Sequence, residues 1–143
     1  MKAQLKADVA LRTFEFHNEL HFATEIAGFP DYFVTTSGFV ITTKGQAPAL
    51  LVNRNINGYM YVRLSNGDTF REQRVHRLVA KAFYEEPSSD RMGGIRNEVN
   101  HIDGDPMNNK VSNLEWCSSQ ENTAHVWGVL RSNDFMEYRY GEA

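Results

Sequence analysis

The sequence predicts an α+β fold, in which an N-terminal antiparallel β-sheet with a packed helix precedes a compact unit of strand, loop, strand and helix. Three features favour this class: β-rich runs separated by turn signals, one amphipathic helical stretch after them, and two short apolar runs that bracket the polar loop 103–112. With 143 residues, 41% of them hydrophobic and 12% aromatic, the chain can fill one shared core. No Gly/Ser-rich or Pro-rich linker divides it, so we expect a single compact unit.

The first elements expected are strands. Residues 10–22 are ambiguous, because Phe14 and Phe16 alternate as in a strand while Leu20 and Ala23 also suit a short helix, so this segment stays open. Residues 32–34 and 39–41 are β-rich runs on either side of a turn that contains Gly38. Glycine allows the positive φ that a tight turn often needs, so these runs predict a hairpin.

A second hairpin and a helix are expected next. Residues 59–64 form a β-rich run, and Asn66-Gly67 is among the strongest hairpin signals, with a return strand over about 69–75. Residues 77–84 place Leu78, Ala82 and either Val79 or Phe83 on one helical stripe, which predicts a helix packed on the sheet. The polar segment 86–97 then predicts a mobile connecting loop.

Composition excludes several classes of protein. Cys117 is the single cysteine, so an intramolecular disulfide framework and a multi-cysteine zinc site are excluded. Residues 1–9 lack the apolar core of a signal peptide, and no run of about 18 apolar residues could span a bilayer. We therefore expect a soluble cytoplasmic protein without a membrane partner.

The segment that carries chemistry follows the loop. Residues 99–102 and 113–117 are short apolar runs, and Ser118 followed by Glu121 is a capping-box pattern that predicts a helix from about 119 to 126. The strings VNHIDGDPMNN, NLEW and EN in this segment resemble the HNH endonuclease family, in the branch found in phage and intron homing endonucleases. The resemblance covers about residues 75–125, and a phage-encoded protein of this kind would act in the host cytoplasm.

The resemblance implies a ββα-metal core, the His-Me finger, over residues 98–127. A β-rich module with a helix over residues 26–85 would precede it, with an N-terminal segment 1–25 and a C-terminal tail 128–143 on either side. In the family pattern His101 is the general base, Asn113 orients it, and Asn100 and Asn122 hold one Mg²⁺ (or Mn²⁺) per active site. Some relatives carry Asp at the position of Asn100, so a neutral amide here implies weaker metal affinity.

The chemistry of these side chains agrees with the roles that the resemblance implies. Phosphodiester hydrolysis needs a base to activate water and a Lewis acid to neutralise developing charge. Histidine has a pKa near neutrality and can accept that proton, while the carbonyl oxygens of Asn100 and Asn122 suit a hard divalent cation.

Other polar residues of the segment receive simpler interpretations. Asp and Asn residues in Asp-Gly-Asp and Asn-Asn strings usually form turns, and four residues are interpreted in this way: Asp103, Asp105, Asn108 and Asn109. A calcium loop is excluded because Asn108 and Leu114 stand where an EF-hand needs Gly and Glu. His76 is interpreted as a tie between helix and sheet, His125 as a surface residue more readily than a metal ligand, and Trp116 and Cys117 as core.

The residues upstream predict contact with double-stranded DNA. Residues 26–40 resemble a short module found ahead of HNH domains in phage homing enzymes. Basic residues that could contact phosphate or bases follow it, namely Arg54, Arg63, Arg74, Arg77 and Lys81. The net charge of −3 argues mildly against nucleic-acid binding, but clustering matters more than the sum.

The sequence therefore predicts a divalent-metal-dependent HNH endonuclease that cuts DNA, of the phage homing type. The alternative is a catalytically silent DNA-binding or regulatory protein with the same fold, which would be expected to have lost His101 or Asn122. A structural protein of a phage particle is a third hypothesis. A monomer would nick one strand, whereas a homodimer could cut both.

Overall fold

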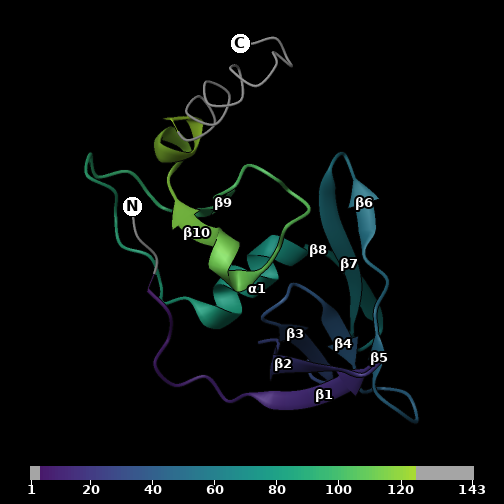
Figure 1. Ribbon diagram of the computed structural model, residues 1–143. Helices are drawn as coiled ribbons and strands as arrows, with labels where there is room; N and C mark the ends of the chain where they lie inside the picture. The colour runs from purple at the N-terminus through teal and green to yellow at the C-terminus, as the bar shows by residue number, and fades with distance from the viewer. Residues whose placement is uncertain (1–3, 125–143) are drawn as a thin grey trace.

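The first sheet is built from consecutive strands that pair in chain order. The computed structural model describes residues 4–124. Five antiparallel strands form this sheet, in the order β1 Arg12–Phe16, β2 Glu19–Glu25, β3 Tyr32–Thr35, β4 Val40–Thr42 and β5 Ala49–Leu50 (Figure 1). The predicted hairpin at Gly38 is confirmed, with Val34 opposite Val40. The ambiguous segment forms β1 and β2, so the alternation of Phe14 and Phe16 was the decisive signal.

A second sheet follows from two tight hairpins. It contains β6 Arg54–Ile56, β7 Tyr59–Asn66 and β8 Thr69–Arg74, each antiparallel to its neighbour. The turn between β7 and β8 is the predicted one, and Gly67 there has a φ of 73°. One face of β7 is polar, whereas Val62 and Leu64 are fully buried against the helix side.

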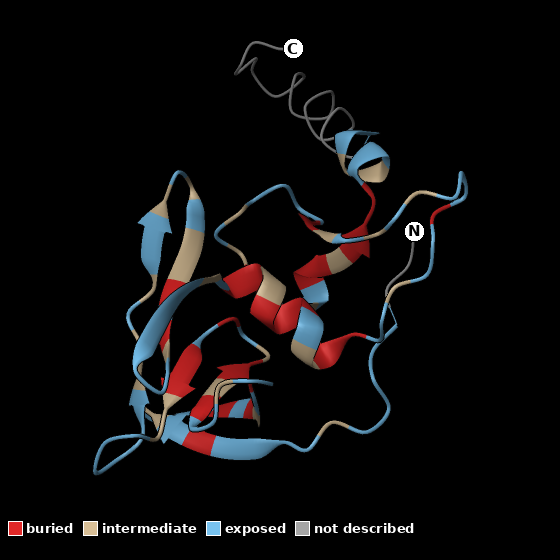
Figure 2. Ribbon diagram, turned by 180° about the vertical axis from the view of Figure 1, so that it is seen from behind, coloured by how far each residue is buried: buried red, intermediate tan, exposed pale blue. Residues whose placement is uncertain are grey.

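The helix α1 (Val75–Phe83) lies at the centre of the molecule, between the first sheet and the last hairpin (Figure 1). It contacts β3, β7, β8, β9 and β10, and most of its surface is buried (Figure 2). Val75, Leu78, Val79 and Phe83 supply the apolar face, while Ala82 of the predicted stripe is only partly buried. Burying each of these larger side chains contributes about 2 kcal/mol, so packing rather than helix propensity holds α1 in place.

The last described elements are β9 (Glu98–His101), a 3₁₀ turn η1 (Val111–Asn113) and β10 (Leu114–Cys117), followed by a helical segment at 119–124. β9 and β10 confirm the two strands predicted around the loop, and they pair antiparallel. Leu114 and Trp116 belong to the same hydrophobic cluster as Val34 and Leu78, so the hairpin and the β-rich part share one core. Residues 86–97 contain no helix or strand.

The N-terminal segment is fixed beside the end of α1. Leu5 forms a β-bridge with Tyr84, and the Lys6 amide donates to the carbonyl of Phe83 at 2.9 Å. In the part of the chain that the structure describes, no helix is long and apolar enough to cross a bilayer. His125, the end of the predicted helix near residue 126 and the tail 128–143 lie outside the described residues.

Candidate active site

The loop between β9 and β10 is organised by Asn113. Its side-chain Nδ2 donates to Asp103 Oδ1 and to the Asn108 carbonyl, both at 2.9 Å, and its Oδ1 accepts from the Asp103 amide at 3.0 Å. The Asn113 carbonyl also accepts from the amide of Ile102 at 2.8 Å, directly after the end of β9. Asn113 thus joins both ends of the loop and fixes the backbone that follows His101.

His101 ends β9 with its ring inside the protein, where only 6% of the residue is exposed. Its Nε2 lies 2.7 Å from Oδ1 of Asn109. An amide oxygen can only accept, so Nε2 carries the proton and the bare lone pair of a neutral His101 lies on Nδ1. Burial lowers the pKa of His101 below its usual value, against the raising effects of the Asn109 hydrogen bond and the carboxylates of Asp103 and Asp105. The ring is therefore neutral at physiological pH.

Two aromatic side chains from other elements pack around this imidazole. The centroid of the His76 ring, near the start of α1, lies 4.9 Å from that of His101, and Tyr59 at the start of β7 lies 5.5 Å from His76 and 6.1 Å from His101. Burial, followed by the proximity of His101, Arg74 and Arg77, lowers the pKa of His76 to about 3. His76 is thus a neutral neighbour of the candidate base, in addition to joining helix and sheet.

The two predicted metal ligands meet carboxylates on one face of the hairpin. Asn100 lies opposite Glu115 in the β9–β10 register and donates its Nδ2 to Glu115 Oε2 at 3.3 Å. Asn122, on the helical segment 119–124, donates its Nδ2 to Glu98 Oε1 at 3.1 Å. Side chains alternate along a strand, so Glu98 and Asn100 share a face. The oxygen donors on this face, two amides and two carboxylates, fit a hard divalent cation.

Within residues 4–124 no three His, Cys, Asp or Glu side chains are grouped to hold a metal ion. Cys117, opposite Glu98, is buried. Burial, followed by the nearby carboxylates of Glu98, Glu115 and Glu121, raises the pKa of its thiol to about 12. Cys117 therefore stays protonated, as expected of a core residue.

A capping box starts the segment that carries Asn122. The Ser118 amide donates to Glu121 Oε1 at 3.1 Å, and the Glu121 amide donates to Ser118 Oγ at 3.2 Å, which confirms the predicted pattern. Arg96, from the preceding loop, donates to both Glu121 oxygens at 2.9 Å. This bidentate pair lies largely out of solvent and fixes the start of the helical segment.

Three of the predicted DNA-contact residues share one face of the β6–β8 sheet. Tyr61 of β7 lies between Arg54 of β6 and Arg74 of β8, and Arg63 lies two residues further along the same face. Arg54 forms an ion pair with Glu72, and the Arg63 guanidinium lies 5.0 Å from the ring centroid of Phe70.

Arg77 and Lys81 extend this surface onto α1. Both line a shallow pocket of about 390 Å³ together with Tyr61, Glu72 and Arg74. Arg77 is also held inward, because its Nη1 donates to the Asn97 carbonyl at 2.8 Å and its guanidinium lies over Trp116. We call Arg54, Arg63, Arg74, Arg77 and Lys81 the basic strip. Tyr59 lies on the same face of β7 as Tyr61 and Arg63, so the strip runs toward His101.

The sequence interpretation missed the contacts of Asn109, His76 and Tyr59. Asn109 was read as a turn former, yet it is buried and bonded to His101. The His-Arg-Leu-Val-Ala string at His76, which resembles the segment preceding this HNH branch, was a signal for that residue. Nothing in the local pattern marked Tyr59, which lies 42 positions before His101.

The family model described as HNH endonuclease matches residues 73–124, which include α1, the β9–β10 hairpin and the start of the following helical segment. An uncharacterized HNH endonuclease of Acanthamoeba polyphaga mimivirus, L247, is 36% identical over 65% of this chain and 22% of its own length. YosQ, derived from the SPbeta prophage of Bacillus subtilis (strain 168) and described as an HNH homing endonuclease, is 34% identical over 68% of this chain and 53% of its own length.

The solved structure of the HNH homing endonuclease I-HmuI, described as showing DNA binding and cleavage, superposes with a TM-score of 0.61. Sequence identity is 28%, and the match covers 79% of this chain and 64% of that one. The chain thus spans between a fifth and about half of the length of these curated relatives. The matched segment contains His101, Asn113 and Asn122 in the geometry described above. We conclude that residues 73–124 of this chain belong to the HNH endonuclease family.

Proposed function

We propose that this protein hydrolyses phosphodiester bonds in double-stranded DNA, with His101 as the general base and a divalent metal ion held by Asn100 and Asn122. One observation carries the proposal. The buried, neutral imidazole of His101 is fixed through Nε2 and directly follows Asn100 in β9, and Asn122 reaches the same face of β9 through its hydrogen bond to Glu98. The names of its relatives, HNH and homing endonucleases, support a nuclease of the homing type.

In this mechanism Nδ1 of His101 accepts a proton from the attacking water, because Nε2 is engaged with Asn109. Asn113 fixes the backbone after His101, which supports the orienting role expected of it. Asn100 and Asn122 would hold a Mg²⁺ or Mn²⁺ ion through their Oδ1 atoms. Such an ion supplies Lewis-acid stabilisation of the charge that develops on the phosphate.

We propose that the basic strip positions the DNA backbone. Arg63 and Arg74 are exposed and form no ion pair within residues 4–124, so they are free to meet phosphates. Arg54 is already paired with Glu72, which competes with phosphate for its guanidinium. The Arg77 guanidinium is held by the Trp116 ring and the Asn97 carbonyl, so it is less available to phosphate. A local strip of this kind reconciles DNA binding with the net charge of −3.

Cleavage of supercoiled plasmid by the purified protein tests the proposal. We expect nicked or linear product with Mg²⁺ or Mn²⁺, no product with EDTA, and a loss of at least about a hundredfold in rate for His101→Ala. His17→Asn, an exposed turn position with a φ of 52°, is the matched histidine control and should cut normally. Nicked product would indicate a monomeric enzyme with one site, and linear product a paired one.

A different outcome would favour the silent DNA-binding alternative. If the wild-type protein binds duplex DNA but cuts no substrate under any metal condition, the nuclease proposal is wrong. If cleavage occurs and His101→Ala retains it, the nuclease stands but His101 is not the base.

A further inference from the structure

The two candidate metal ligands are asparagines, and an asparagine amide presents an oxygen or an NH₂ group depending on a half-turn of its terminal torsion. Only the oxygen can bind a cation. Where a ligand is a carboxylate, this choice does not arise. A metal site built from Asn100 and Asn122 therefore needs neighbouring groups that hold each amide with its oxygen toward the cation.

Two carboxylates are placed to make that selection. Glu115 stands directly across the strand pair from Asn100 and accepts its Nδ2 at 3.3 Å. Glu98, two residues before Asn100 on the same strand face, accepts Nδ2 of Asn122 at 3.1 Å. Each contact engages the NH₂ end of the amide, so each Oδ1 is turned away from the carboxylate and accepts no hydrogen bond from the described residues 4–124.

Neither carboxylate is explained by an ion pair. Glu98 and Glu115 are both half-buried, yet the salt bridges of residues 4–124 are Arg54–Glu72 and Arg96–Glu121. Partly burying a carboxylate without a salt-bridge partner costs free energy, and Arg77 attracts Glu98 only from beyond salt-bridge distance. A cation beside Asn100 and Asn122 would offset that cost and would benefit from the added negative charge, which the neutral Asn100 does not itself supply.

We propose that Glu98 and Glu115 are positioning residues that hold the Asn122 and Asn100 amides with their oxygens toward the metal ion. The inference rests on the proposed function, because it takes Asn100 and Asn122 as the ligands. Groups that orient metal ligands in this way typically affect metal affinity by about 10-fold to 100-fold when they are removed.

A titration of the full chain with Mn²⁺ in the absence of DNA tests this role independently of cleavage. Binding is monitored as the loss of the electron paramagnetic resonance signal of free Mn²⁺. We expect Glu115→Ala and Glu98→Ala to raise the Mn²⁺ dissociation constant about 10-fold. Glu115→Gln and Glu98→Gln should bind Mn²⁺ more tightly than the alanine variants, because the glutamine carbonyl can accept the same Nδ2 hydrogen, but less tightly than the wild type, because the negative charge is lost. Glu15→Ala, at an exposed position of β1, is the control and should bind as the wild type.

Two results would overturn the inference: alanine variants with wild-type affinity, or glutamine variants no better than alanine variants. Circular dichroism checks folding, and if an alanine variant does not fold, Glu115→Asp replaces it. This variant keeps the charge but withdraws the acceptor by one methylene, so unchanged affinity would count against the orienting role. Asn100→Ala and Asn122→Ala complete the set. If these two retain full affinity, the ligand assignment itself fails; if they weaken binding while the Glu variants do not, only the positioning role fails.

Discussion

A histidine that accepts a proton from water must be neutral and must present a bare ring nitrogen. At His101 burial favours the neutral form, and the Asn109 carbonyl oxygen takes the Nε2 hydrogen. Asn109 therefore selects the tautomer as well as the ring orientation. Its burial beside the ring distinguishes it from the adjacent Asn108, whose side chain donates to Asp103 Oδ2 and accepts from the Lys110 amide.

His76 should make the folded state sensitive to acid. Its pKa is about 3 in the folded protein and near 6.5 in an unfolded chain, so the unfolded state binds a proton that the folded state does not. The stability that this difference contributes is present above about pH 6.5 and is lost as pH falls toward 3. We expect a loss of about 1 kcal/mol between pH 7 and 5.5 from this residue alone.

Urea unfolding at these two pH values measures the effect. His76→Phe keeps an aromatic ring against His101 and Tyr59 but cannot bind a proton, so it should lose less stability on acidification than the wild type. Equal losses in the two proteins would show that His76 is already protonated in the fold or is not buried as described.

At the scale of elements, the turn between β3 and β4 supports the candidate site from outside the HNH segment. The Val111 amide donates to the carbonyl of Thr36 at 2.9 Å, which joins this turn to η1. Gly38, in the same turn, packs directly on Asn109: a Cβ added to it would lie 2.8 Å from the Cβ and the carbonyl oxygen of Asn109. The first sheet therefore buttresses the residue that holds His101.

Gly38→Ala is expected to disturb the site through this contact. The added methyl group must displace Asn109, and the φ of 92° already disfavours a side chain, so we expect a loss of about 1–3 kcal/mol in stability and a fall in cleavage rate of about 10-fold. Gly67→Ala is the matched control, since Gly67 also has a positive φ but no atom within 4 Å of an added Cβ. It should lose stability and keep its cleavage rate. Equal effects on cleavage by both variants would remove the case for a specific contact.

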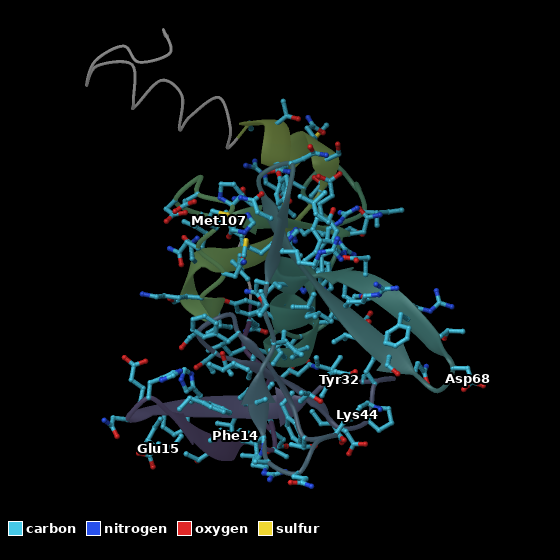
Figure 3. All side chains as sticks on the ribbon, turned by 90° about the vertical axis from the view of Figure 1, so that its right-hand side faces the viewer. Phe14, Glu15, Tyr32, Lys44, Asp68 and Met107 are labelled. Atoms are coloured by element: carbon cyan, nitrogen blue, oxygen red, sulfur yellow. The ribbon has the colours of Figure 1, made fainter. Side chains whose placement is uncertain are left out.

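For the whole molecule, the arrangement of charge predicts how DNA binding depends on salt. The basic strip lies along the β6–β8 sheet and α1. The first sheet is drawn below α1 in Figure 1, and Figure 3 shows the side chains of the described residues. If Arg63 and Arg74 each meet a phosphate, the slope of log affinity against log salt should fall by about 2 in the Arg63→Gln/Arg74→Gln double variant.

Arg12→Gln is the control for this measurement. Arg12 is an exposed cation on β1 that stacks over Phe14, and its loss should leave the slope unchanged. Fluorescence anisotropy with a duplex at several salt concentrations gives the slopes. The same fall in both proteins would mean that overall charge, rather than the strip, governs binding.

The sequence by itself determined the β3–β4 and β7–β8 hairpins, the central helix, the strands β9 and β10 and the HNH family, whereas it left β1 and β2 open and did not predict β5 or β6. These predictions depend on local signals: alternation, Asn-Gly and glycine turns, the capping box, and a motif contained within about 25 residues. The roles given to His101, Asn100, Asn113 and Asn122 remain predictions, although the structure gathers these residues around one hairpin.

Only the tertiary structure decided which distant side chains surround that hairpin. Tyr59, His76 and Gly38 reach His101 or Asn109 because α1 and the turns of two sheets pack against one core. The partners of the asparagine amides likewise depend on strand register, since a shift by one residue would turn Glu115 to the opposite face. Local spacing specifies which residue types are present, whereas packing and register specify which atoms meet.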